Sequence, residues 1–236
     1  MHNRAYYDEF SALYEQRRHE GYHALVDRLE TDLVRRYAEG RDVLEAGCGT
    51  GLILRRLSTF ARRAVGIDLS SGMLAHAHGR GLAVAQASVT HLPFADESFD
   101  VVCSFKVLAH VQPIAEAVAE LARVTRPGGH LLLEFYNPHS LRGLVKRWKP
   151  PTAISQRVND EAVFTRYDTL ADIERLLPPG HAIVDLRGVR VLTPAAAAFA
   201  VAPLGRVLGY LEEKACDAPG LRRLGGFLIA VIRKPG

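Results

Sequence analysis

The segment from Val43 to Gly51, Val-Leu-Glu-Ala-Gly-Cys-Gly-Thr-Gly, constrains the fold more than any other part of the chain. Its apolar start is typical of a buried strand, and its alternating glycines are typical of a tight turn into a helix. Because glycine has no Cβ, such a turn can adopt left-handed dihedral angles and let a ligand lie against the main chain. A second apolar run, residues 64–68, ends in Asp68 about 20 residues further on, where a carboxylate can bind both hydroxyls of a ribose. Together the two segments predict a nucleotide site at the ends of adjacent strands.

Spacing separates the nucleotide-binding motifs that this segment could represent. A dinucleotide fingerprint, Gly-x-Gly-x-x-Gly, requires glycine where this chain has Leu52. A phosphate-binding P-loop requires Gly-Lys-Ser/Thr, and residues 52–54 supply none of it. The pattern that is present, Glu-x-Gly-x-Gly-x-Gly, resembles the first motif of the class I S-adenosylmethionine (SAM) methyltransferases. The resemblance covers residues 41–137 closely and the rest loosely, and it is to the small-molecule branch that includes methyltransferases of ubiquinone and menaquinone biosynthesis.

Composition limits the class of protein. The chain has 236 residues, of which 48% are hydrophobic, so it can bury the core of one globular domain. Its net charge is only +4, whereas a nucleic-acid binder more often carries a concentrated basic stripe. No apolar run is long enough to span a membrane, and the N-terminus does not resemble a signal peptide. The three cysteines match no metal-binding spacing. We therefore expect a cytoplasmic protein with no metal, whose Cys48 and Cys103 are reduced and packed.

Strand and helix patterns alternate from Arg41 onward, which is typical of a parallel sheet covered on both faces. Strands are expected at 42–46, 63–68, 82–86, 99–105, 130–136, 181–187 and 226–232, and helices at 50–60, 70–78, 112–126 and within 194–214, the last interrupted by Pro203. Ser70 and Ser71 can cap the helix after Asp68, Asp168 can cap another that ends at 178–179, and residues 127–129 predict a turn. The predicted class is α/β: a Rossmann-like, seven-stranded, mostly parallel sheet with an antiparallel last strand.

We expect one methyltransferase domain over residues 1–236. Residues 1–40 form an N-terminal helical segment in which an apolar stripe recurs every four residues and Gly40 ends a helix. Residues 41–137 form the SAM-binding core. Two helical cap insertions, 138–180 and 189–225, would leave the sheet at its carboxyl edge and cover the substrate pocket.

The resemblance implies where the cofactor would bind. Backbone N–H groups of the glycine turn face the cofactor's carboxylate, Glu45 reaches toward its ammonium group, and Asp68 binds the ribose, although Asp68 could instead cap a helix. Ser88 stands where the family usually has an acid that accepts from the adenine amino group, so the chain departs from the pattern there. The full set of implied cofactor contacts is Glu45, Gly47, Cys48, Gly49, Gly51, Asp68, Leu69, Met73, Ser88, Val89, Ser104 and Phe105.

The acceptor side of the predicted site is less defined. His110 is a candidate general base, because a neutral imidazole near pH 7 can accept a proton, but a packed structural histidine is an equal alternative. Lys106 is unusual at an otherwise apolar position and could pair with a pocket acid or an anionic substrate. The remaining candidate substrate contacts are Tyr6, Tyr14, Tyr136, Trp148 and Tyr167.

The resemblance implies transfer of the SAM methyl group to an O, N or C nucleophile of a small, largely apolar molecule, leaving S-adenosylhomocysteine as product. One alternative is an RNA-modifying methyltransferase, for which the basic run 142–149 could serve as a patch. Another is a non-catalytic SAM-binding protein, which the departure at Ser88 makes conceivable. The Asn/Asp-Pro-Pro motif of amino-methylating DNA enzymes is absent after the fourth strand, so no DNA substrate is expected. A homodimer is left open.

Overall fold

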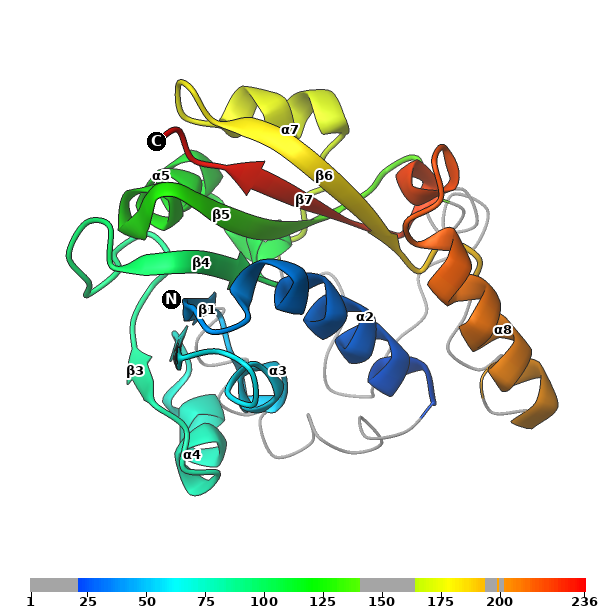
Figure 1. Ribbon diagram of the computed structural model, residues 1–236, viewed down its shortest axis with the longest axis horizontal. Helices are drawn as coiled ribbons and strands as arrows, with labels where there is room; N and C mark the ends of the chain where they lie inside the picture. Colours follow the sequence, from blue (N-terminus) through cyan, green and yellow to red (C-terminus); the bar gives the residue numbers. More distant parts are fainter. Residues whose placement is uncertain (1–20, 141–163, 194–198, 200–201) are drawn as a thin grey trace.

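The computed structural model describes residues 21–140, 164–193, 199 and 202–236 (Figure 1). Its centre is one seven-stranded sheet in the order β3-β2-β1-β4-β5-β7-β6. Five strands are parallel, and β7 runs antiparallel between β5 and β6. The predicted Rossmann-like, mostly parallel sheet with an antiparallel last strand is confirmed. The strands are β1 (Asp42–Ala46), β2 (Arg63–Asp68), β3 (Val84–Gln86), β4 (Phe99–Ser104), β5 (Thr125–Tyr136), β6 (Ala182–Val189) and β7 (Phe227–Arg233).

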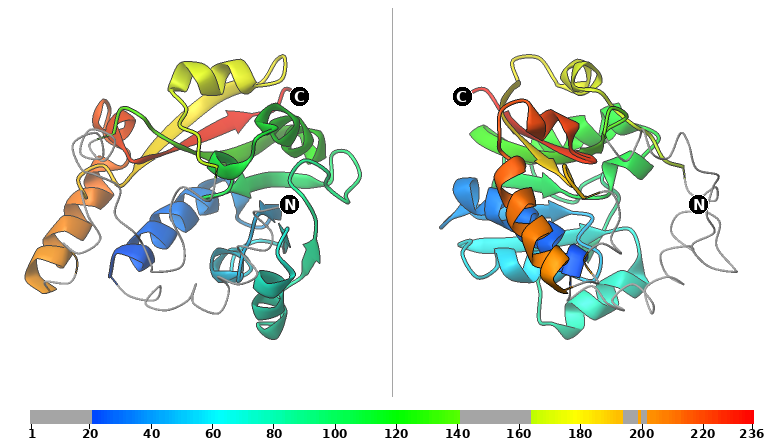
Figure 2. Two further views of the ribbon diagram at one scale, coloured as in Figure 1. Left: turned by 180° about the vertical axis from the view of Figure 1, so that it is seen from behind. Right: turned by 90° about the vertical axis from the view of Figure 1, so that its right-hand side faces the viewer.

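Helices cover both faces of the sheet (Figures 1 and 2). One layer holds α2 (Gly21–Ala38), α3 (Leu52–Leu57) and α4 (Ser71–Gly79), and the other holds α5 (Ile114–Val124) and α7 (Leu170–Leu176). Helix α8 (Ala202–Ala215) lies beside α2, and short 3-10 helices occur at Leu108–His110 (η1) and Leu221–Leu224 (η4). No helix among the described residues is long and apolar enough to cross a bilayer.

Two predicted helix ends are confirmed. The apolar stripe of α2 is buried, the helix ends at Ala38, and Gly40 follows with a φ of 69°. The Ser70 hydroxyl caps α4 by accepting from the Met73 amide at 3.1 Å, while Ser71 is the first residue inside the helix. Both ends follow from local chemistry: a left-handed glycine and a side-chain acceptor for an unpaired amide.

The predicted cap of α7 is wrong by one residue. Thr169, not Asp168, caps this helix: its hydroxyl accepts from the Asp172 amide at 3.2 Å, and the Asp172 carboxylate accepts from the Thr169 amide at 3.0 Å. Asp168 is held elsewhere, since its amide donates to Tyr136 and its buried carboxylate pairs with Arg166 at 2.6 Å. The reciprocal capping box therefore fixes where the helix starts.

The turn expected at residues 127–129 lies inside a strand. Strand β5 begins at Thr125, which pairs with Phe99, and the pairing then shifts so that His130 faces Val101. The intervening residues form a bulge in which Gly128 has a φ of 71°. A Cβ on Gly129 would lie 2.6 Å from the carbonyl oxygen of Asp100, so this close approach requires glycine.

Helices α3, α5 and α8 also differ from their expected bounds. Helix α3 is shorter than 50–60 because Gly51, with a φ of 82°, is its N-terminal cap. Helix α5 starts at Ile114 and ends at Val124, where β5 follows directly. Helix α8 begins at Ala202, with Pro203 in its first turn, where proline is tolerated because helix amides there have no partner. The basic run at 142–149 falls outside the described residues.

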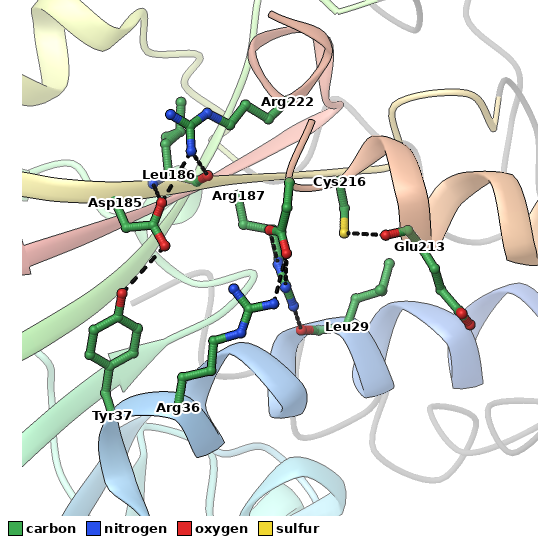
Figure 3. Close-up of polar contacts among 10 residues, drawn as sticks. Leu29, Arg36, Tyr37, Asp185, Leu186, Arg187, Glu213, Cys216 and Arg222 are labelled. Atoms are coloured by element: carbon green, nitrogen blue, oxygen red, sulfur yellow. Dashed lines mark hydrogen bonds and ion pairs between the residues drawn. The ribbon is translucent and has the colours of Figure 1, made fainter. Parts of the chain in front are cut away.

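A buried arginine joins the C-terminal part of the chain to α2 (Figure 3). Arg187 on β6 donates from Nη1 to the Leu29 carbonyl at 2.8 Å and from Nε to Asp217 at 2.7 Å. Asp217 also accepts from Arg36 at 2.7 Å. Only 3% of the Arg187 side chain is exposed, whereas 38% of the Asp217 side chain is, so water reaches the pair from the Asp217 side. The pair holds α2 against the end of α8.

Candidate cofactor and acceptor site

The glycine turn adopts the conformation that its sequence predicts. Gly47, Gly49 and Gly51 have φ values of 84°, 53° and 82°, all in the left-handed region. The amides of Gly47 and Cys48 donate to the Ile67 carbonyl at 2.7 and 2.9 Å, which joins the turn to β2. A Cβ on Gly47 would lie 2.2 Å from a methyl carbon of Val107. The turn is therefore packed too closely for any other residue at that position.

Asp68 connects the end of β2 to this turn. Its Oδ2 accepts from the Gly49 amide at 2.8 Å, and its Oδ1 accepts from the Ser70 amide at 2.9 Å. The carboxylate thus lies against the middle glycine of the turn and also supports the start of α4. The structure brings together the acid and the glycines that the sequence singled out.

The residues expected beside the adenine differ in exposure. Leu69 is 45% exposed, and its carbonyl accepts from Gln86 at 2.9 Å. Met73 and Val89 are buried among core residues. The Ser88 hydroxyl lies 2.8 Å from the Thr90 hydroxyl and accepts from the Thr90 amide at 3.3 Å, so it already has local partners.

Strand β4 contributes Ser104 and Phe105 at the same edge of the sheet. The Ser104 hydroxyl is buried and donates to the Ala46 carbonyl at 2.8 Å. Phe105 packs on the α2 side of the sheet. With both side chains engaged in the fold, the groups that these residues could offer a ligand are those of the backbone, as the resemblance implied.

Beneath this edge lies a buried group, here called the acid–lysine cluster: Asp27, Glu30, Glu45, Lys106 and Glu134. Sequence reasoning named Glu45 and Lys106 and left open that Lys106 pairs with an acid, but it missed Asp27 and Glu30 as the partners. Lys106 Nζ is 3.3 Å from Asp27 Oδ1 and 2.7 Å from a Glu30 carboxylate oxygen. The Lys106 amide donates to Glu134 at 3.1 Å, and Lys106 has a φ of 60°. All four acids are buried. The sequence contains one signal of this cluster. Glu30 lies four residues after Val26 and four before Val34, so an acid falls within the apolar stripe of α2.

Burial controls the protonation of this cluster. Desolvation raises the pKa of Glu30, Glu45 and Glu134, most strongly for the last two, and the Lys106 ammonium opposes the shift. Among the described residues, Glu45 Oε2 and Glu134 Oε2 have no hydrogen-bond partner. The carboxyls of Glu30 and Glu134 face each other, so a proton held between them would satisfy both. The cluster is thus able to hold protons at a pH where exposed carboxyls have lost theirs.

This protonation predicts how stability changes with pH. A carboxyl whose folded pKa is raised binds more protons in the folded than in the unfolded chain, so its contribution falls as pH rises from its ordinary pKa of 4.5 through the raised one. We expect Glu45→Gln to lessen the loss of unfolding free energy between pH 5 and pH 8, as measured by urea unfolding. Glu116→Gln, at an exposed position on α5, is the matched control and should behave as the parent. Equal pH dependence in the Glu45 variant and the parent would contradict this account.

His110 lies in an aromatic group at the ends of β4 and β5. Its Nδ1 is 2.9 Å from the Phe164 carbonyl, and its ring meets Tyr136 edge to face at 5.7 Å. Tyr136 also contacts Tyr167, which is 46% exposed, at 6.0 Å. Because a carbonyl can only accept, Nδ1 carries the hydrogen and Nε2 is the basic nitrogen of the neutral ring. Three acceptor-side candidates, His110, Tyr136 and Tyr167, are therefore brought together.

The other acceptor-side candidates are separate from this group. Lys106 belongs to the acid–lysine cluster on the α2 face. Tyr6, Tyr14 and Trp148 lie outside the described residues. A groove of about 630 Å³ between α2 and α8 is lined by residues such as Leu25, Phe199 and Tyr210, and no candidate site residue lines it.

The structure also shows the state of the cysteines and of possible metal ligands. Cys48, Cys103 and Cys216 are free and buried, as expected for the first two, and burial raises their pKa values. No group of His, Cys, Asp or Glu side chains in the described part of the chain is arranged to hold a metal ion.

Part of the chain is similar to known methyltransferases. Residues 44–133 match the family model described as a methyltransferase domain. A probable SAM-dependent methyltransferase of Mycolicibacterium smegmatis is 40% identical over 100 residues, covering 42% of this chain and 39% of that protein. A demethylmenaquinone methyltransferase of Mycobacterium marinum is 40% identical over 106 residues, covering 44% of this chain and 46% of that protein. The chain thus spans less than half the length of either relative.

A solved structure agrees in fold over nearly the whole chain. A SAM-dependent methyltransferase of Thermotoga maritima, described as a possible histamine N-methyltransferase, superposes with a TM-score of 0.68. The match covers 97% of this chain and 98% of the other at 20% identity, so it speaks for the fold alone. The family match lies inside residues 41–137, the segment over which the sequence resembles the class I SAM methyltransferases. The resemblance drawn from the glycine turn is therefore confirmed.

Proposed function

We propose that the chain transfers the SAM methyl group to an O, N or C nucleophile of a small, largely apolar molecule, because residues 44–133 match the family model described as a methyltransferase domain. The observation that carries this proposal is the contact of Asp68 with Gly49 at the ends of two adjacent parallel strands. It sets a carboxylate for ribose hydroxyls beside a left-handed glycine turn, which is the arrangement that nucleotide cofactors use.

The residues present fit such a cofactor. The buried Glu45 carboxyl has an oxygen, Oε2, without a hydrogen-bond partner among the described residues, at the end of the strand that leads into the glycine turn. An ammonium group is a suitable partner for it, as the resemblance implies. Asp68 would hold the ribose, and the backbone at Ser104 and Phe105 would face the methionine end. Bound SAM supplies an activated methyl group, and holding an acceptor in line with that group can account for about 7–11 kcal/mol of the barrier.

The aromatic group of His110, Tyr136 and Tyr167 indicates which kind of acceptor would suit the site. Tyr136 and Tyr167 offer apolar ring surface, and His110 adds one polar, basic nitrogen. Pockets for organic ligands are typically apolar with a few placed polar groups. The demethylmenaquinone methyltransferase among the relatives is consistent with an apolar acceptor. Three further predictions belong to this proposal: a cytoplasmic location, no DNA substrate, and a homodimer left open. An RNA substrate remains the alternative to a small molecule.

The proposal is tested by incubating the protein with deuteromethyl-labelled SAM and a metabolite extract. Mass spectrometry should find the label in a small apolar product, together with S-adenosylhomocysteine. Label recovered in RNA, and lost after nuclease treatment of the extract, would favour an RNA-modifying enzyme. Binding of SAM without any labelled product would favour a non-catalytic SAM-binding protein.

His110→Gln tests the proposed base. A positioned base contributes on the order of 10²–10⁴-fold to a proton transfer, so we expect turnover to fall by at least tenfold if the acceptor loses a proton. Affinity for SAM, measured by calorimetry, should not change. His78→Gln on α4, at an exposed position, is the control. Unchanged turnover in the His110 variant would make this histidine structural.

A further inference from the structure

Exposed apolar side chains gather on one part of the molecule. Of the ten large apolar side chains that are exposed among the described residues, six lie on α8 and η4. We call them the α8 patch: Leu204, Val207, Tyr210, Leu211, Leu221 and Leu224. Their exposed fractions run from 40% to 60%. Single exposed apolar residues are ordinary on a protein surface, whereas a group of this size marks an interaction site.

The fold fixes which side of α8 faces outward. Gly205 packs so closely that a Cβ there would lie 2.9 Å from the Phe199 carbonyl oxygen. On the same side, the buried Glu212 carboxylate accepts from the Leu192 amide and the Thr193 hydroxyl, each at 3.0 Å. With this inner face held by backbone contacts, the helix cannot rotate to bury Val207 or its neighbours. Figures 1 and 2 show α8 at one end of the molecule, beyond α2.

Charges on the same elements are unbalanced. The acids of these elements have partners: the buried Glu212 bonds to the segment after β6, Glu213 pairs with Arg28 at the surface, and Asp217 pairs with Arg187 and Arg36. The cations of the surface are Arg206, Lys214 and Arg223, which are exposed and make no ion pair with a described residue. The Lys214 ammonium lies over the Tyr210 ring at 5.6 Å. The α8 patch is therefore apolar with a positive border.

We propose that the α8 patch binds an anionic lipid surface. An apolar helix face bordered by cations suits the boundary between lipid headgroups and acyl chains, where burial and charge attraction act together. A second copy of the chain fits less well, because a two-fold interface would set the same cations against each other. Binding at this patch does not depend on methyl transfer.

The α8 patch is connected to the candidate site through the strands of the sheet. Helix α8 leaves the sheet between β6 and β7, whose ends at Val189 and Phe227 pair with each other, and Phe227 also pairs with Tyr136. The rings of Tyr136 and Phe227 contact each other at 5.0 Å. The patch therefore begins at the edge of the sheet that holds the acceptor-side residues.

Vesicle co-sedimentation of the full chain tests the proposal. We expect binding to vesicles of phosphatidylcholine mixed with phosphatidylglycerol at least about tenfold stronger than to phosphatidylcholine alone, and weaker at high salt. Val207→Glu and Leu211→Glu should each reduce binding at least about fivefold, because each removes apolar contact and adds a repelled charge. The matched control is Val184→Glu on β6, where the parent side chain is 50% exposed, and it should bind as the parent does.

A second variant separates lipid binding from misfolding. Arg206→Glu changes an exposed cation and should lower binding to anionic vesicles at least about fivefold with an unchanged circular dichroism spectrum. Absence of vesicle binding would overturn the proposal, as would an equal loss in the Val184 variant. A concentration-dependent dimer that Val207→Glu disperses, seen by light scattering without vesicle binding, would assign the patch to a second copy instead.

Discussion

Lys106→Met is expected to lower the free energy of unfolding by about 3–5 kcal/mol near neutral pH, because it leaves buried carboxylates without their ammonium partner. The exposed fractions of the Asp27 and Glu30 side chains are 3% and 0%, so solvent cannot replace the lost charge. The loss should be larger at pH 8 than at pH 5. At the lower pH, Glu30, whose pKa burial already raises, can take up a proton and become neutral. Urea unfolding at the two pH values measures both effects.

Two further variants make this result specific. Lys214→Met, at an exposed position, should change stability by less than about 1 kcal/mol. Adding Glu30→Gln to Lys106→Met should recover part of the loss, because it removes one of the carboxylates left without a partner. Equal losses in the Lys106 and Lys214 variants, or no recovery in the double variant, would show that Lys106 is not neutralising the cluster.

Asp68→Ala is expected to weaken binding of SAM and of S-adenosylhomocysteine at least tenfold in calorimetry. Hydrogen bonds to a charged acceptor are worth about 1.5–3 kcal/mol each, and the variant loses those to the ribose as well as the one that holds Gly49. Asp68→Asn keeps an acceptor for one backbone amide and should lose less. The control is Asp96→Ala, which removes a carboxylate that is 74% exposed and pairs with Arg123. Affinity equal to that of the parent in Asp68→Ala would remove Asp68 from the cofactor site.

The positions of the strands and the fold class were predictable because their signals are local and repeat along the chain. Apolar runs separated by helical patterns indicate a parallel sheet, and the glycines at 47, 49 and 51 indicate a left-handed turn, which the φ values confirm. The two errors have different causes. The bulge in β5 depends on the approach of Gly129 to Asp100 on another strand, and no pattern within one segment carries that information. The start of α7 is a local signal, the capping box of Thr169 and Asp172, which the prediction of Asp168 as the cap overlooked.

Part of the candidate site could also be predicted from the sequence, and part could not. Asp68 could be placed beside the glycine turn from sequence, since parallel strands end at a common edge and register is fixed by their pairing. The acid–lysine cluster could not be predicted from the sequence in this way. Asp27 and Glu30 read as polar positions on a helix until Lys106 is known to lie against them. The exposure of the α8 patch could not be predicted from the sequence either. It depends on which face of α8 packs against the protein, and that is the face with the glycines.

The sequence by itself determined the fold class, the glycine turn and the acid that lies beside it, because backbone periodicity and the freedom of glycine act over a few residues. Only the tertiary structure decided that Lys106 pairs with residues 79 and 76 positions earlier in the chain, and that Glu45 and Glu134 hold raised pKa values nearby. The energy of a charge depends on its burial and on the charges around it. Those quantities exist only once distant segments have packed together, and no stretch of sequence contains them alone.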